Sequence, residues 1–334
     1  MNSKRRNHFD VTNTVNVSHA ASVRLAVQHL LSALFPRTDP RPITLAFDTF
    51  TQLYAGTLPG YVGCDTWYHD AQHSLDCALT AARLVDGHER NVWTTHPLGE
   101  QRSILTIVIA LFHDAGYIRR TIDTARNGAE YTLTHVRRSG DFLADFLPLI
   151  GMAEHIELAQ RLVHYTGYEV ALDRLDVKDP HDHMIGCILG TADILSQTAD
   201  RCYLEKCRDY LYREFEIGGL AGNHNSDNGT RAHYSSVEDL LEKTPVYVNQ
   251  LRRERLDGFF EKAHRYLEVH FGGENPYLQQ IELHLTTIAR MNQQHDYSLL
   301  RRRPRAIGLA EMREQVKPIP RSSGAVIKRL RASV

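Results

Sequence analysis

The sequence predicts an all-α fold. Apolar residues recur along most of the chain at the i, i+3, i+4 and i+7 positions that form one face of a helix. Ala, Leu, Glu, Arg and Gln fill most of the intervening positions, and these residues favour helix locally. No series of β-branched segments with alternating polarity and hairpin turns interrupts this pattern. The chain has 334 residues, 42% of them hydrophobic, so it can bury a sizeable core.

The expected helices follow one another along the chain. In the first half they cover residues 21–35, 70–85, 102–112, 134–147 and 153–163, and Thr134 is a candidate N-cap of its helix. In the second half they cover residues 184–198, 199–216, 237–241, 247–271 and 277–291. Residues 218–234 are rich in Gly, Asn and Ser, which is typical of a loop that borders or covers a site.

The domain organisation follows from composition. We expect a flexible N-terminal segment over residues 1–20, a single helical domain over residues 21–300 and a flexible basic tail over residues 301–334. The tail contains ten Lys and Arg residues and two acidic ones, whereas the whole chain has a formal charge of −1. This balance excludes a wholly basic nucleic-acid-binding protein. For the tail, a solubilising role is favoured over contact with nucleic acid or a membrane.

The cysteines and the longest apolar run indicate where such a chain would work. The cysteines are odd in number and never form a C-x-x-C pair, which favours a reducing cytoplasm over a disulfide scaffold; they are Cys64, Cys77, Cys187, Cys202 and Cys207. The longest apolar run, residues 104–112, is far shorter than the roughly 20 residues that span a bilayer. We therefore expect a cytoplasmic protein with no membrane partner; the sequence does not indicate an oligomeric state.

Polar residues interrupt the most apolar segments. The run that ends at Phe112 is followed directly by His113 and Asp114, and Asp193 falls inside another apolar helix. Because burying an unpaired polar group costs several kcal/mol, these side chains must be hydrogen-bonded, paired or bound to metal. His69 and His73 lie four residues apart, so they share a helix face.

Two more histidines complete a metal-binding pattern. His135 starts a predicted helix and His164 ends one. Together with His73, His113, Asp114 and Asp193 they form a set of imidazoles and carboxylates without a thiolate. Such a set suits one or two divalent ions of Mn, Fe, Co, Ni or Zn, with Mg as a further candidate.

On the basis of these motifs, residues 61–196 are similar to the HD-domain superfamily of metal-dependent phosphohydrolases, which is named after its His-Asp pair. The residues Tyr68-His69, His73-Ser-Leu-Asp76, His113-Asp114 and Ala192-Asp193-Ile-Leu-Ser196 are similar to motifs of the cyclic nucleotide phosphodiesterases. His135, Gly140 and His164-Tyr-Thr-Gly167-Tyr168 are similar to two-metal HD and HD-GYP proteins. The resemblance implies a helical bundle built around a metal site.

The resemblance also implies roles for single residues. His73, His113, Asp114 and Asp193 would hold one ion, and Asp114 would bridge to a second ion held by His135 and His164. A hydroxide between the ions would attack phosphorus, and His69 would protonate the leaving alkoxide. The expected reaction is hydrolysis of a phosphodiester of a nucleotide, cyclic or not.

Residues around the motifs are weaker candidates for substrate binding. Arg119 and Arg120 follow the His-Asp turn and could contact phosphate, although two arginines in a solvated loop are about as common. Tyr117 could line a base pocket, and Gln250 lies loosely where the phosphodiesterases keep a Gln that grips purine. Asp65 or Asp76 could fix the tautomer of His69 by a hydrogen bond.

Two other functions are compatible with the same ligands. A di-iron oxygenase of this superfamily uses the same six residues, but it needs no proton donor such as His69. A nucleotide-binding HD module without turnover is the other alternative, although such modules typically lack some of the ligands, and this sequence has all six.

Overall fold

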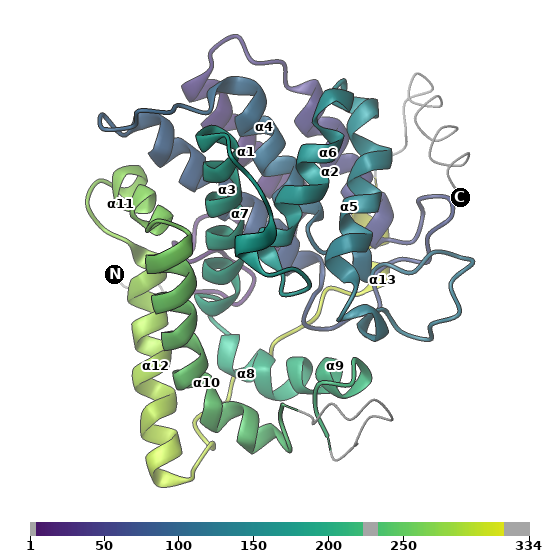
Figure 1. Ribbon diagram of the computed structural model, residues 1–334. Coiled ribbons are helices and arrows are strands. Elements are labelled where there is room, and N and C mark those ends of the chain that lie inside the picture. Colours follow the sequence, from purple (N-terminus) through teal and green to yellow (C-terminus); the bar gives the residue numbers. More distant parts are fainter. Residues whose placement is uncertain (1–4, 223–232, 317–334) are drawn as a thin grey trace.

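The computed structural model describes residues 5–222 and 233–316, and within these ranges the chain forms helices and no strand beyond isolated bridges. The all-α prediction is therefore confirmed. The middle of the molecule is built on helix α3 (Ala71–Arg90), which packs against α1 (Ala20–Leu34), α4 (Gly99–Phe112), α7 (Pro180–Thr198) and α11 (Tyr266–Phe271) (Figure 1).

Helix α3 is buried from Ala71 to His88 because its neighbours surround it. Small residues allow this close packing. A Cβ on Gly87 would lie 1.8 Å from the carbonyl oxygen of Tyr266 at the start of α11, so only glycine fits there. Helices α4 and α7 are also buried over most of their lengths, which explains why their sequences are apolar on every face.

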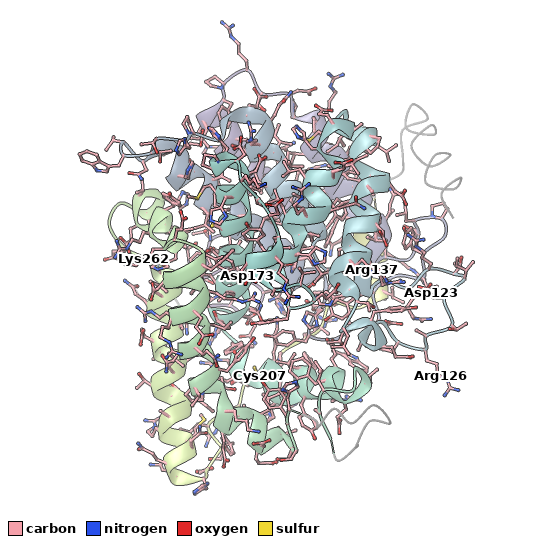
Figure 2. All side chains as sticks on the ribbon, in the orientation of Figure 1. Asp123, Arg126, Arg137, Asp173, Cys207 and Lys262 are labelled. Carbon is pink, nitrogen blue, oxygen red and sulfur yellow. The ribbon has the colours of Figure 1, made fainter. Side chains whose placement is uncertain are left out.

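The remaining helices surround this centre. α2 (Arg41–Tyr54), α5 (His135–Phe146) and α6 (Ile156–Leu162) lie on one side, whereas α8 (Tyr203–Lys206) and α9 (Tyr212–Ile217) lie below the centre in the view of Figure 1. α10 (Val237–Leu251) and α12 (Pro276–Gln294) lie side by side as a long pair. In Figure 2, Arg126 projects from the outer loop between α4 and α5, whereas Cys207 lies among the lower helices, directly after α8.

Two expected boundaries differ from the structure around α10. The sequence predicts that one helix ends at residue 241 and the next begins at residue 247, yet α10 continues through Pro245 between them. Proline cannot donate to the carbonyl of Leu241, and the Asn292 side chain on α12 donates to that carbonyl and to the next one, at 3.5 and 3.2 Å. The expected helix over residues 247–271 is instead broken at Glu261 and Lys262, which have positive φ angles of 52° and 60°.

Two segments of π-helix interrupt the lower half of the bundle. One covers Cys207–Leu211 between α8 and α9, and the other covers Arg252–Phe259 after α10. π-Helical turns are frequent at functional sites. Both segments contribute residues to the main cavity of the molecule: Cys207 and Leu211 from the first, Arg255 from the second.

Helix α2 was not expected from the sequence, because its threonines and aromatic residues are weak helix formers. Its buried residues nonetheless keep the helical spacing: Ile43, Phe47, Phe50 and Tyr54 all face the core.

Both chain ends differ from the expected flexible segments. Within residues 5–19, Asp10 is fully buried and accepts a hydrogen bond of 2.7 Å from Arg83 on α3. Beyond residue 300, helix α13 (Leu309–Gln315) packs on α2, and the amide of Ile307 donates to Asp70 at 2.9 Å. The domain therefore extends to residue 316; residues 1–4 and 317–334 of the two expected segments lie outside the described residues. No helix in the described ranges is both long and apolar enough to cross a membrane.

Candidate metal centre and active site

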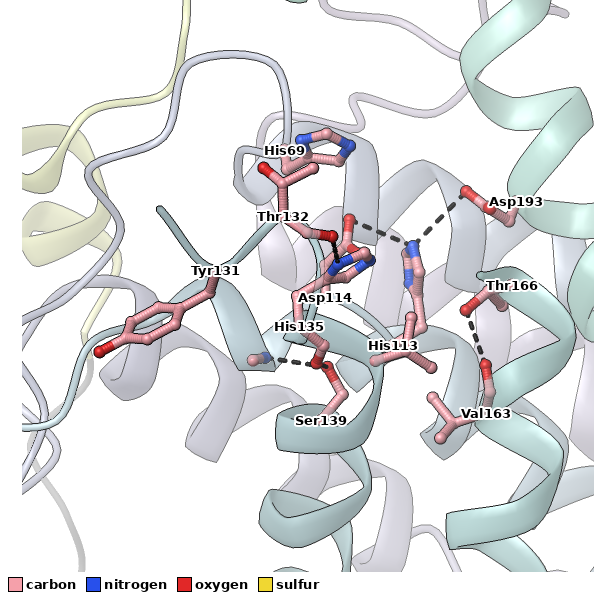
Figure 3. Close-up of polar contacts among 12 residues, drawn as sticks. His69, His113, Asp114, Tyr131, Thr132, His135, Ser139, Val163, Thr166 and Asp193 are labelled. Carbon is pink, nitrogen blue, oxygen red and sulfur yellow. Dashed lines mark hydrogen bonds and ion pairs between the residues drawn. The ribbon is translucent and has the colours of Figure 1, made fainter. Parts of the chain in front are cut away.

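Four ligand atoms from three helices converge at the centre of the bundle. Nε2 of His73 lies 3.3 Å from Asp114 Oδ2 and 3.2 Å from Asp193 Oδ1. Nε2 of His113 lies 3.2 Å from the same Asp114 oxygen, 3.5 Å from the same Asp193 oxygen and 3.2 Å from His73 Nε2. Figure 3 shows the His113 ring between the two carboxylates.

Local structure fixes each of these atoms. His73 lies in the first turn of α3, whose N-cap Asp70 accepts a hydrogen bond from the His73 amide at 3.1 Å. His113 closes α4, and its Nδ1 donates to the carbonyl of Ala110 at 2.8 Å, so in the neutral ring Nε2 carries the lone pair. Asp193 lies inside α7, where Gln197 one turn later donates to its Oδ1 at 3.0 Å.

The donor set and its spacing fit a divalent metal ion. Ligands that sit about 2.0–2.2 Å from one ion lie about 3–3.5 Å from one another, and the two imidazole nitrogens lie 3.2–3.5 Å from each other and from each carboxylate oxygen. Oδ2 of Asp114 is buried and has no hydrogen-bond partner. The neighbouring thiol of Cys77 is a weaker candidate, because burial raises its pKa to about 11 and so keeps it protonated.

The charges of the cluster are strongly coupled. Burial alone would lower the pKa of His73, but the carboxylates of Asp114 and Asp193 raise it to about 9. The same carboxylates hold the pKa of His113 well above its ordinary value despite burial. In the protein without an ion, protons on these imidazoles therefore neutralise the two carboxylates, and a metal ion must displace those protons.

The second oxygen of Asp114 faces His135. Oδ1 lies 3.7 Å from His135 Nε2, and His135 Nδ1 donates to the carbonyl of Thr132 at 2.8 Å. Burial lowers the pKa of His135, which favours the neutral ligand form. The structure thus brings His135 to the Asp114 carboxylate, as the sequence predicts for a second ion.

Gly116 makes this approach feasible. A Cβ there would lie 1.9 Å from the carbonyl oxygen of His135, so the turn after His113-Asp114 packs directly on the first turn of α5. Within α5 the expected cap by Thr134 is absent. Instead, Glu169 accepts hydrogen bonds from the amides of Val136 and Arg137, at 2.7 and 3.1 Å.

His164 lies near the same Glu169 carboxylate that is 4.0 Å from His135 Nδ1. Among the described residues, it makes no ion pair or hydrogen bond with the other five predicted ligands. The ring is half-buried, and burial lowers the pKa of His164, although the nearby Glu169 carboxylate opposes this effect. Its Nδ1 has no hydrogen-bond partner.

His69 lies beside the cluster and is held by a buried carboxylate. Its ring centre is 6.0 Å from that of His73 and 6.2 Å from that of His135, and its ring stacks on Tyr117 at 4.5 Å. Its Nδ1 is hydrogen-bonded to Glu214 at 2.6 Å. The other oxygen of Glu214 accepts from the amides of Trp67 and Tyr68 at 2.5 and 2.6 Å.

Glu214 therefore takes the position that the sequence analysis offered to Asp65 or Asp76. Asp65 is instead engaged by Arg119, at 2.8 Å, and by the amide of Gly128. Asp76 is buried and forms no hydrogen bond with His69 among the described residues, and burial raises its pKa to about 7. No signal in the sequence distinguishes Glu214 from other glutamates of a helix, because its burial arises from packing against a segment 146 residues earlier.

A cavity of about 250 Å³ opens from the cluster toward the lower helices. His69, His73, Asp114, His135 and Asp193 lie at one end. The rest of its wall is mostly aromatic and aliphatic, and Tyr117 belongs to it as predicted. Arg255, which no motif in the sequence singles out, also lines the cavity, and its guanidinium lies 3.8 Å from the ring centre of Tyr168.

Three predicted substrate contacts lie outside this cavity. Arg119 is paired with Asp65 and donates to the carbonyl of Ala125. Arg120 lines a separate hollow beside Tyr61 and Phe142. Gln250 is exposed on α10 and bonded to Glu254 at 3.0 Å. Proximity along the chain to His113-Asp114 did not bring the two arginines to the site, because the chain turns away after Tyr117.

Comparison with known proteins identifies no relative: no family model, no curated protein and no solved structure matches this chain.

Proposed function

We propose that this protein is a metal-dependent phosphohydrolase of the HD-domain type, acting as a phosphodiesterase. The observation that carries the proposal is a juxtaposition. A buried cluster of two imidazoles and two carboxylates, spaced as metal ligands, shares one end of a cavity with a histidine that is held by a buried glutamate. Phosphoester hydrolysis needs both parts: charge neutralisation at phosphorus and a proton for the leaving oxygen.

The metal ligands would be His73, His113, Asp114 and Asp193, with His135 on the second oxygen of Asp114. Divalent ions bound there would polarise the phosphate oxygens and lower the pKa of water to near neutrality. Hydrogen bonds from Nδ1 of His113 and His135 to backbone carbonyls keep both rings in the ligand tautomer.

His69 would act as the general acid. Because Nδ1 is bonded to Glu214, Nε2 is the nitrogen that can donate a proton to a leaving oxygen. The carboxylate of Glu214 stabilises the imidazolium form, and the two backbone amides hold that carboxylate in place. Stacking on Tyr117 restricts the rotation of the His69 ring.

The His69–Glu214 pair also weighs against the di-iron oxygenase, which has no alkoxide to protonate. A nucleotide ester as substrate and a cytoplasmic location stay predictions from the sequence.

The proposal is tested on purified protein loaded separately with Mn, Fe, Co, Ni, Zn and Mg, and assayed with a panel of phosphodiesters and phosphomonoesters. We expect hydrolysis with at least one metal, and its loss in Asp193→Asn. Glu205→Gln is a matched control, since Glu205 is equally buried on α8 but lies outside the cavity. Metal binding without hydrolysis of any ester, or full activity of Asp193→Asn with unchanged metal content, would contradict it.

A further inference from the structure

The wall of the cavity opposite the metal cluster is apolar. Its side chains come from the first π-helical segment, α9, α10 and the chain between α9 and α10. They include Leu211, Phe215, Leu220, Tyr234, Leu240 and Leu251. Phe215 and Tyr234 stack with ring centres 5.6 Å apart and an interplanar angle of 7°. Contact between this surface and an apolar group of a ligand is favourable, whereas the surface has few hydrogen-bonding groups for a polar one.

Most polar groups in the wall are already bonded within the protein. The hydroxyls of Thr132, Thr166 and Thr244 each donate to a backbone carbonyl of their own segment, at 2.6, 2.8 and 2.8 Å. The amide of Gln197 donates to Asp193 and accepts from the Tyr68 hydroxyl.

The charged groups of the wall, Glu169 and Arg255, are also engaged, although among the described residues Arg255 uses only one of its five N–H groups in a hydrogen bond. Both carboxylate oxygens of Glu169 accept from amides at the start of α5. Arg255 donates to the carbonyl of Gly167 and lies over the Tyr168 ring, whose hydroxyl is bonded to that of Tyr247. A nucleobase would therefore bury most of its donors and acceptors against this wall without a free side-chain amide to pair with them, which weakens its binding.

From this wall we infer that the substrate is a phosphoester whose organic group is compact and apolar, such as an aryl group, rather than a nucleoside. The inference rests on the proposed function, since the phosphate is assigned to the metal cluster. The volume of about 250 Å³ agrees with a compact group, because pockets for larger ligands run from roughly 300 to 1,000 Å³.

The test compares the binding of three phosphonates, whose C–P bonds are not hydrolysed, by calorimetry on Mn-loaded full-length protein. The probes are methylphosphonate, 1-naphthylmethylphosphonate and the phosphonate analogue of AMP. We expect the naphthyl compound to bind at least tenfold more tightly than methylphosphonate, and the AMP analogue to stay within threefold of methylphosphonate. Tighter binding of the AMP analogue than of the naphthyl compound, or equal binding of all three, would overturn the inference.

Variants assign the effect to the cavity. Leu211→Asn and Phe215→Ala should each weaken the binding of naphthylmethylphosphonate at least tenfold and leave the affinity for methylphosphonate unchanged. Leu283→Asn, on a side chain of α12 that is 57% exposed, should change neither. An unchanged affinity for the naphthyl compound in both cavity variants would refute its placement there.

A fourth probe, 1-naphthol, lacks the phosphonate and therefore tests the apolar cavity independently of the proposed phosphohydrolase function. If naphthol binds and depends on Leu211 while no phosphonate binds, the proposed phosphohydrolase function fails and the apolar cavity stands. If phosphonates bind, but naphthol does not bind and the naphthyl compound binds no more tightly than methylphosphonate, the proposed function stands and the inference about the substrate fails.

Discussion

Replacing Glu214 by Gln tests the proposed general acid most directly. The Glu214 side chain is fully buried, and its two oxygens have separate tasks. One accepts from two backbone amides, which a glutamine oxygen can still do. The other binds His69, and there the variant replaces a carboxylate oxygen with an amide NH₂.

The magnitude follows from that single change. A hydrogen bond to a charged group contributes about 1.5–3 kcal/mol. If His69 donates its proton in the transition state, losing this bond should lower kcat/KM by about 10- to 150-fold. Esters with a 4-nitrophenol leaving group need little protonation, so the variant should affect them much less than alkyl esters.

The assay is steady-state hydrolysis by the wild type, Glu214→Gln, His69→Ala and the double variant. Because Glu214 acts through His69, the effects should not add, and the double variant should be no slower than His69→Ala. Glu205→Gln again serves as the control for removing a buried carboxylate. Additive effects, or a Glu214→Gln rate within twofold of the wild type on alkyl esters, would refute this role.

Three further predictions concern the metal, a glycine and the N-terminal segment. Asp114→Asn should lower the bound metal, measured by elemental analysis, by at least one ion per chain; Asp65→Asn, outside the cluster, should not. Gly116→Ala should cost about 1–3 kcal/mol of unfolding free energy in urea and reduce metal content, since the added Cβ meets the His135 carbonyl; Gly151→Ala, at a site with open space but a φ of 76°, separates strain from overlap. The third prediction concerns Asp10 in the N-terminal segment. Burial alone would raise the pKa of its carboxyl group, but the Arg83 guanidinium lowers this pKa from 3.8 to about 2. The carboxylate therefore contributes about 2 kcal/mol above pH 3.8, lost as the pH falls through 2. Asp10→Asn should lose at least that much at pH 7, and a loss independent of pH between 7 and 2 would contradict the linkage.

Much of the site can be predicted from the sequence because local structure carries it. His113 and Asp114 follow a run that is apolar on all faces, and Asp193 interrupts another such run. A polar group in such a place needs a partner, either in its own helix or among the polar groups of the helices packed against it. The structure brings His73, His113, Asp114 and Asp193 together for this reason, with His135 beside them.

The helix boundaries could be predicted only where local signals decide them. The break expected between residues 241 and 247 is absent, because Asn292 on another helix donates to the carbonyl that Pro245 cannot bond. The weak helix formers of α2 are held in a helix by the burial of one face, which is a tertiary effect.

By itself, then, the sequence determined the helical class of the fold and the side chains that must find polar partners in its interior, because periodicity and misplaced polarity are local properties. Only the tertiary structure decided which distant groups those partners are. In that structure His69 is bonded to Glu214, and Arg255 lies in the wall of the cavity. Arg119 and Arg120 lie outside the cavity. These contacts join residues that are tens to more than a hundred positions apart, and no local pattern encodes which side chain of one helix meets which side chain of another.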